Sequence, residues 1–265
     1  MTSGVNDPHY LVQQGFAYRF DWGLDGLRSL ARHADVVIIV DVLRFTSAVC
    51  AALESGAAVF PYPWERDDLD AYASDRDAVA AGRREDGGPS LSPTDLLTMA
   101  PDSRIVLPSP NGSALSFAAR DLGARRVLAG CLRNATATAR YARSALAASA
   151  GEHPVIAVIA AGERWGDASG PLRPSVEDLI GSGAILTALD PSHAVASPCC
   201  SPEAAAARAA FQHTRPRLYE TLCATGSGRE LLARGWDDDV ATSAALDVTT
   251  VVAELIDDAF VAVAP

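Results

Sequence analysis

Residues 36–41 read Val-Val-Ile-Ile-Val-Asp, a run of β-branched apolar residues that ends at a carboxylate. A continuous apolar run of this length is typical of a strand that is buried on both faces of a sheet. A carboxylate at the end of such a strand is costly to bury alone, so we expect a metal ion or an arginine beside Asp41. The segment therefore predicts a central strand with a functional residue at its exit.

On either side of this run, short apolar segments alternate with longer segments rich in Ala and Leu, which is the pattern of an α/β protein. Strands are predicted at residues 16–21, 36–40, 58–62, 104–107, 126–129 and 155–160. Helices are predicted at residues 24–32, 46–54, 65–81, 113–122, 135–148 and 176–189. The pattern also predicts a surface loop over 82–92 and a loop rich in Gly and Pro over 162–174. A mostly helical tail is predicted from 202 onward, with a break at 226–228. We interpret residues 1–265 as a single α/β unit, with two closely packed lobes dividing near 135–150 as the alternative.

Composition excludes several classes of protein. The 265 residues carry 22 basic and 33 acidic side chains, which gives a net charge of −11 and argues against nucleic acid as a partner. No segment approaches the ~18 apolar residues of a membrane helix, and the N-terminus lacks the pattern of an export signal, so we expect a cytoplasmic protein without a membrane partner. The composition leaves open whether the chain forms a homo-oligomer.

Every basic residue other than histidine is an arginine, and the sequence contains no lysine. This excludes the Walker A phosphate loop, Schiff-base chemistry and a lysine general base, since each requires an amine. The cysteines are odd in number and lack paired Cys-x-x-Cys spacing, which argues against a zinc site or a disulfide framework. They are Cys50, Cys131, Cys199, Cys200 and Cys223.

Polar residues follow four of the predicted strands at the point where each strand ends. Because the carboxyl ends of parallel strands lie at one edge of a sheet, where open α/β folds bind ligands, we expect the functional site there. Asp41 and Arg44 follow the strand at 36–40, and Ser109, Asn111, Gly112 and Ser113 follow the strand at 104–107. Asn134 follows the strand at 126–129, and Glu163 follows the strand at 155–160.

The carboxylates in this set indicate the chemistry. Oxygen ligands of this kind hold hard divalent cations, and Mg²⁺ takes one or two carboxylates together with waters and phosphate oxygens. Arginine and helix N-termini neutralise phosphate oxygens. The pattern therefore predicts metal-assisted phosphoryl transfer to water. The expected metal ligands are Asp41, Glu163, Glu177 and Asp178.

Each of these motifs also has a purely structural interpretation. Asn134 is a good residue for capping a helix, and Ser109-Pro110-Asn111-Gly112 favours a turn. Ser175 followed by Glu177 and Asp178 is the pattern of a helix cap with acidic residues in the first turn.

Five motifs, in this order and spacing, resemble the 2-phosphosulfolactate phosphatase family. They are residues 36–49 (VVIIVDVLRFTSAV), 109–113 (SPNGS), 134–139 (NATATA), 162–163 (GE) and 177–186 (EDLIGSGAIL), and residues 226–244 also look like the C-terminal segment of that family. In the family, the residues that follow the Asp-Val-Leu-Arg motif are small and rich in Thr, whereas here Phe45 follows Arg44. We expect this ring to reshape the pocket.

The resemblance implies a Mg²⁺-dependent phosphatase that hydrolyses 2-phosphosulfolactate to 3-sulfolactate and phosphate, a step towards coenzyme M. It also implies a layered α/β/α fold with a mixed, largely parallel sheet. By position, Asp41, Arg44 and Glu163 would be catalytic, and the residues at 109–113 together with Asn134 would bind the substrate. Either a metal-activated water or the Asp41 carboxylate would attack the phosphorus.

Two rival functions remain open at this stage. Residues 223–229 match Cys-x5-Arg, a loop in which a thiolate at Cys223 would attack phosphate, although such a loop should follow a strand. The other rival is a non-catalytic protein that binds a small acidic metabolite at the same strand exits.

Overall fold

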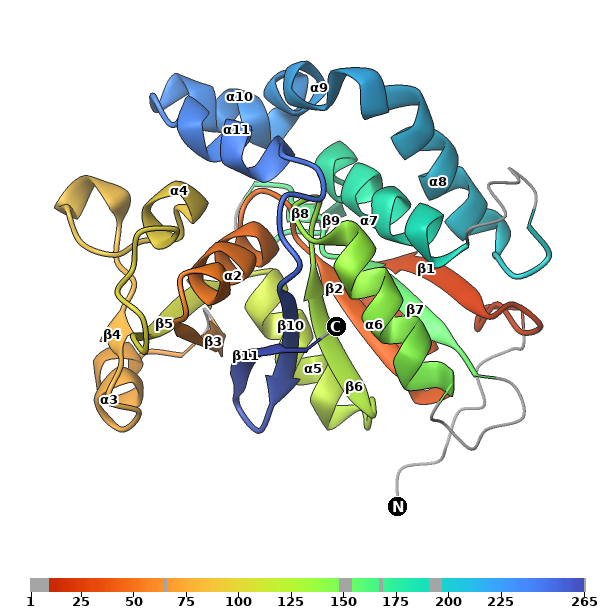
Figure 1. Cartoon of the computed structure of the whole chain (residues 1–265), viewed down its shortest axis with the longest axis horizontal. Helices are drawn as coiled ribbons and strands as arrows, with labels where there is room; N and C mark the ends of the chain where they lie inside the picture. Colours follow the sequence, from red (N-terminus) through yellow and green to blue (C-terminus); the bar gives the residue numbers. More distant parts are fainter. Residues whose placement is uncertain (1–9, 64–65, 148–153, 167–168, 191–196, 265) are drawn as a thin grey trace.

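The computed structural model describes residues 10–63, 66–147, 154–166, 169–190 and 197–264. Strands and helices alternate and form a layered α/β/α fold around a mixed, mostly parallel sheet, so the predicted fold class is confirmed (Figure 1). The strands are β1 (Tyr18–Trp22), β2 (Val36–Val40), β3 (Ala58–Pro63), β4 (Val79–Ala80), β5 (Arg104–Ser109), β6 (Arg126–Gly130), β7 (Ile156–Ala160), β8 (Glu163–Arg164), β9 (Leu172–Arg173), β10 (Val252–Ile256) and β11 (Ala259–Val263). The α-helices are α1 (Gly23–Leu30), α2 (Phe45–Glu54), α3 (Leu69–Ser74), α4 (Pro93–Leu96), α5 (Gly112–Asp121), α6 (Ala135–Ala147), α7 (Val176–Leu189), α8 (Pro202–Thr214), α9 (Leu218–Ala224), α10 (Gly226–Ala233) and α11 (Asp237–Ala244).

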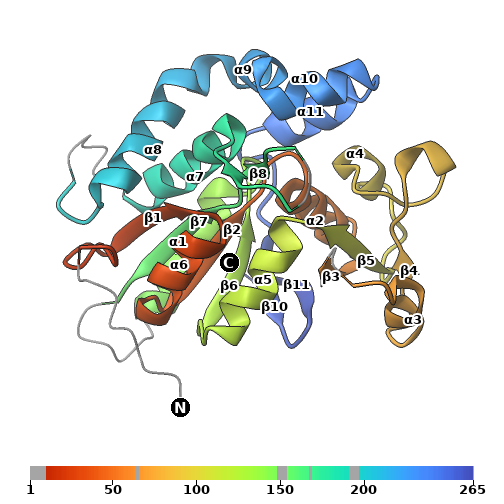
Figure 2. The same cartoon turned by 180° about the vertical axis from the view of Figure 1, so that it is seen from behind.

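The central strand β2 is buried along its whole length, as its sequence predicts. Val36, Ile38 and Val40 pack into the core that contains residues of α6 and α7, whereas Val37 and Ile39 pack into the core that contains residues of α1 and α5. Figures 1 and 2 show these two pairs of helices on opposite faces of the sheet. Burying an aliphatic side chain of this size stabilises a fold by about 1.5–3 kcal/mol, so this strand is a main contributor to the core.

The sheet consists of two parallel groups joined by a hairpin. Its order is β1-β7-β2-β6-β10-β11-β3-β5-β4, and the pairs β6–β10, β10–β11 and β11–β3 are antiparallel. The joint is narrow, because β11 meets β3 through the single registered pair Phe260–Val59. The three antiparallel pairs make the strands of the two groups run in opposite directions, yet the exits of β5 and β2 meet where Gly112 N–H donates to Asp41.

Two predictions about secondary structure are wrong. The tail is helical from α8 to α11, but residues 252–263 form the hairpin β10–β11 in the main sheet. The helix predicted at 65–81 is reduced to α3, followed by the short strand β4, and residue 65 lies outside the described residues. The predicted break at 226–228 is displaced, since Thr225 separates α9 from α10 and its hydroxyl accepts a hydrogen bond from Gly228 N–H at 3.1 Å.

Helices α8 to α11 form an arc along the edge at which β2 ends (Figure 1). The small hairpin β8–β9 lies at the same edge, in the segment that the sequence predicts as a loop. Of the helices in the described part of the chain, none combines the length and the apolar character needed to span a bilayer. The interpretation of the chain as a single α/β unit, with two closely packed lobes as the alternative, stays a prediction.

Candidate active site

Asp41 lies at the exit of β2 and is buried, with 6% of its surface exposed. Its Oδ1 accepts a hydrogen bond from Phe45 N–H at 3.2 Å, and its Oδ2 accepts one from Gly112 N–H at 3.0 Å. These donors belong to the first turns of α2 and α5, where backbone N–H groups have no partner within the helix. The strand exits of β2 and β5 therefore meet at this carboxylate.

The pKa of Asp41 is raised to about 7, first by burial and then by the negative charges of Glu163 and Glu177, while the two backbone donors lower it. The net direction shows that the N–H groups of two helices do not compensate for the buried negative charge. A cation placed among these carboxylates would supply that compensation.

Asp178, in the first turn of α7, joins two strand exits. Its Oδ1 accepts a hydrogen bond from Val42 N–H at 2.7 Å, and its Oδ2 accepts one from Gly162 N–H at 2.9 Å. Burial, together with the negative charges of Asp41 and Glu177, raises its pKa well above the ordinary value. Because both oxygens bind the backbone, Asp178 positions the loops that follow β2 and β7, which goes beyond the helix-cap interpretation.

Glu163 is half-buried at the start of β8, and its Oε2 accepts a hydrogen bond from Asn111 Nδ2 at 3.2 Å. Burial raises the pKa of Glu163, whereas the bond from Asn111 and the positive charge of Arg173 lower it. Arg173 is the register partner of Glu163 in the β8–β9 hairpin. Asn111 thus connects the turn after β5 to the carboxylate that follows β7.

The serines at 109 and 113 hold the turn in shape. Ser109 Oγ accepts hydrogen bonds from Asn111 N–H at 3.3 Å and from Gly112 N–H at 3.2 Å. Ser113 Oγ donates a bond to the carbonyl oxygen of Leu107 at 3.0 Å. In the absence of a substrate these two hydroxyls support the turn, and their substrate contact stays a prediction.

Two other predicted site residues direct their hydrogen bonds to groups outside this cluster of carboxylates. Asn134 is fully buried, where its Oδ1 accepts a bond from Cys131 N–H and its Nδ2 donates one to the Val251 carbonyl. Arg44 follows a cis peptide bond, and its Nη1 donates to Asp239 Oδ2 of α11 at 2.7 Å. The role of Asn134 in substrate binding therefore stays a prediction, whereas its structural role is evident from its hydrogen bonds.

Gly112 is the residue on which the junction of β2 and β5 depends. A Cβ atom at this position would lie 2.2 Å from Phe45 Cδ1 and 2.9 Å from Asp41 Oδ2, and both side chains are buried. The ring of Phe45 packs edge-on to Phe260, with the ring centroids 6.2 Å apart. The ring that departs from the family pattern thus belongs to the core beneath the carboxylate, and it requires a glycine opposite.

We expect Gly112→Ala to lower the free energy of unfolding by about 1–3 kcal/mol, because the added methyl group overpacks this junction. Urea denaturation measures the loss. Gly88→Ala is the matched control, since a Cβ atom at Gly88 meets nothing within 4 Å. An unchanged urea midpoint for Gly112→Ala would show that the contact with Phe45 is looser than described.

Residues 26–258 match the family described as 2-phosphosulpholactate phosphatase. The chain belongs to this family. A Thermus thermophilus protein named "Probable 2-phosphosulfolactate phosphatase" is 35% identical over 118 residues, which cover 42% of this chain and 48% of the relative. The chain thus aligns with about half the length of that curated relative. The family resemblance predicted from the motifs is confirmed.

In this member of the phosphosulfolactate phosphatase family, no three His, Cys, Asp or Glu side chains of the described residues are arranged to hold a metal ion together. Mg²⁺ does not need three, because it keeps several waters and takes phosphate oxygens as ligands. Asp41 and Glu163 would suit such a site, because Asn111 binds Glu163 while the next residue, Gly112, binds Asp41. The four-carboxylate ligand set stays a prediction.

Sequence reasoning missed Arg173, the cationic neighbour of Glu163. It stands in a segment rich in Gly and Pro that the sequence predicts as a loop, so nothing indicated its pairing across a hairpin. The alternation of polar and apolar residues at 163–164 and 172–173 is too short to predict strands.

Proposed function

We propose that the protein is a Mg²⁺-dependent phosphatase that hydrolyses 2-phosphosulfolactate to 3-sulfolactate and phosphate. Membership of the family supports the reaction, and the name of the Thermus relative supports the substrate. The observation that carries the proposal is the buried Asp41 carboxylate, which meets the N-termini of two helices and lies within the electrostatic influence of Glu163 and Glu177.

Asp41 and Glu163 would hold the cation in this proposal, and Glu177 lies near enough to raise the pKa of Asp41. When bound, Mg²⁺ would neutralise charge on the transferring phosphoryl group and lower the pKa of water. Asp178 would position the loops at the exits of β2 and β7, and Asn111 would orient Glu163.

In the reaction, an oxygen–phosphorus bond forms with the attacking group and the ester bond between phosphorus and the C2 oxygen breaks. The leaving oxygen takes up a proton to give the hydroxyl group of 3-sulfolactate. Asp41 would take the proton from an attacking water. Direct attack by the Asp41 carboxylate on phosphorus is the alternative, and it uses the same residue.

The direct test is phosphate release from a panel of phosphorylated hydroxy acids that includes 2-phosphosulfolactate. We expect release in the presence of Mg²⁺ and near-complete loss of release with excess EDTA, restored when Mg²⁺ is returned. Turnover that persists in EDTA would contradict the metal requirement. The absence of release from every ester would favour the non-catalytic binding protein.

The thiolate mechanism at Cys223 finds no support in the fold. Cys223 lies within helix α9, whereas a loop of the Cys-x5-Arg type should follow a strand. We expect Cys223→Ser to retain most of the phosphate release, measured with the same substrate panel. Loss of turnover in this variant at unchanged thermal stability would support the thiolate mechanism.

Several finer properties belong to the proposal as well. We propose a cytoplasmic location, a place in the synthesis of coenzyme M, and a small anionic phosphorylated substrate with no nucleic-acid partner. These rest on the acidic composition and on the family.

A further inference from the structure

A cavity of about 510 Å³ is lined by five arginines, although the chain as a whole carries a net charge of −11. They come from four separate segments of the sequence. The arginines are Arg44, Arg66, Arg83, Arg84 and Arg234, and we call this cavity the arginine pocket. Among the described residues that line it, Glu85 is the one carboxylate.

Carboxylates outside the lining pair with four of these arginines, and Arg83 pairs with Glu85 within it. Asp239 is fully buried and accepts hydrogen bonds from Arg44 Nη1 at 2.7 Å and from Arg84 Nη1 at 3.2 Å. Arg84 Nη2 also donates to Asp238 at 2.7 Å. Arg84 also lies 3.4 Å from Asp95 through both Nε and Nη2, so all of its nitrogens face carboxylates. Arg44 is fixed through Nη1 and loses little freedom when its other donors bind an anion.

Donor groups remain for a ligand. Within the described part of the chain, Arg44 makes its hydrogen bond through Nη1 alone, so its other N–H groups are available. Trp236 stands between three of the arginines, whose guanidinium carbons lie 4.9 Å (Arg44), 5.7 Å (Arg84) and 5.1 Å (Arg234) from its ring centroid. The ring keeps these three cations close to one another, and each of them is also paired with a carboxylate outside the lining.

The arginine pocket borders the carboxylate site. Pro108 and Pro110 line it, and Pro110 directly precedes Asn111, which donates to Glu163. Arg44 also lines the arginine pocket and follows Asp41 by three residues in the sequence. A small ligand with its phosphate at the carboxylates would therefore extend its remaining groups towards the arginines.

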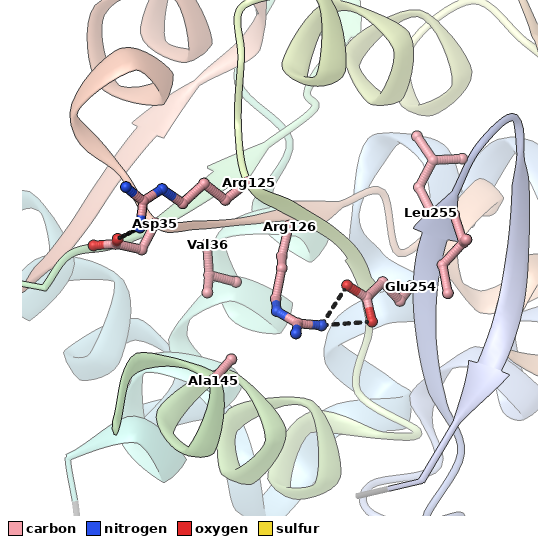
Figure 3. Close-up of a pocket in the computed structure, with 8 residues that line it drawn as sticks. Asp35, Val36, Arg125, Arg126, Ala145, Glu254 and Leu255 are labelled. Carbon is pink, nitrogen blue, oxygen red and sulfur yellow. Dashed lines mark hydrogen bonds and ion pairs between the residues drawn. The ribbon is translucent and has the colours of Figure 1, made fainter. Parts of the chain in front are cut away.

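Another cavity, of about 520 Å³, offers a contrast, because its lining holds two carboxylates and two arginines (Figure 3). It lies where β2 and β6 begin, away from the exits of these strands. Arg126 donates to both oxygens of Glu254 at 2.8 and 3.0 Å, and Arg125 pairs with Asp35 at 3.5 Å. Its charges face one another, so this cavity has no excess of cationic donors.

We propose that the arginine pocket binds the non-reacting acidic groups of the substrate, the sulfonate and the carboxylate. This rests on the proposed function for the identity of the ligand, but not for the presence of an anion site. Planar guanidinium groups bind such oxyanions through paired hydrogen bonds, and Arg44 would make those contacts through Nε and Nη2. The pocket would thereby select esters with acidic groups beyond the phosphate.

The test is calorimetric titration of the full-length protein with 3-sulfolactate and, separately, with lactate, which lacks the sulfonate. We expect 3-sulfolactate to bind more tightly than lactate. We expect Arg44→Gln to weaken 3-sulfolactate binding roughly 30-fold or more. Arg234→Gln should weaken it by about threefold to tenfold, because the Arg234 side chain is half exposed and its interactions are screened.

The matched control is Arg28→Gln, an exposed arginine of α1 outside the pocket, which should leave binding unchanged. Thermal unfolding of each variant identifies a folding defect, and Arg234→Gln keeps the test valid if Arg44→Gln does not fold. The proposal would be overturned if 3-sulfolactate failed to bind the wild type, or if Arg234→Gln bound it as tightly as the wild type does. Arginine-dependent binding without phosphate release from any ester would support the pocket while contradicting the proposed phosphatase.

Discussion

Replacing Asp41 with asparagine should lower kcat for phosphate release by about 10³-fold or more. The substitution keeps the size of the side chain but removes the negative charge that would hold the cation and accept the proton. It also places an amide NH₂ against one of two backbone donors, those of Phe45 and Gly112. Steady-state release of phosphate from 2-phosphosulfolactate measures the effect.

The matched control is Asp25→Asn, at a fully solvated carboxylate of α1, which should retain wild-type turnover. Circular dichroism and thermal unfolding show whether the Asp41 variant is folded. A folded Asp41→Asn protein with full activity would place the chemistry elsewhere than at the exit of β2.

The metal-free protein should lose stability as the pH rises from about 4 to about 7. Burial raises the pKa of Asp41 from 3.8 to about 7, so between these values the folded protein keeps a proton that the unfolded chain has released. Stability therefore falls as pH rises, by on the order of 4 kcal/mol for a shift of about three pH units, and the loss is complete above about pH 7. Urea denaturation at several pH values in EDTA measures it.

Mg²⁺ should reverse this loss, and more strongly at pH 8 than at pH 5, because the carboxylates must be deprotonated to bind it. The comparison with Asp41→Asn isolates the contribution of this residue, since all other titrating groups are shared. The variant should show a flatter pH dependence in EDTA and a smaller gain from Mg²⁺. Equal pH profiles for the two proteins would show that Asp41 is already ionised in the metal-free fold.

Local pattern was sufficient to predict most of the parallel strands and the residues at their exits. The run at 36–40 is apolar throughout, so it predicts burial on both faces, and the polar residue that follows it marks the edge of the sheet. Asp41, Asn111, Gly112, Glu163 and Asp178 do converge there.

The hairpin at 252–263 and the arginine pocket could not be predicted in the same way. The two hairpin strands are short and follow a long helical stretch. Their alternation of apolar and polar residues was therefore too brief to distinguish them from the preceding helices. Arg84 and Arg234 are distant in the sequence and meet only because Trp236 and Asp239 bring α11 against the loop after β4. No spacing between these residues carries that information.

The position of the hairpin β10–β11 also bears on how the protein matures. During synthesis on the ribosome, both parallel groups of strands emerge before the hairpin that connects them. The hydrogen bond between Gly112 and Asp41 joins those two groups of strands. A nascent chain that ends before residue 252 lacks the two strands that connect the groups within the sheet. Catalytic competence would then be acquired late, and truncation at this terminus would be far more damaging than its distance from Asp41 in the sequence suggests.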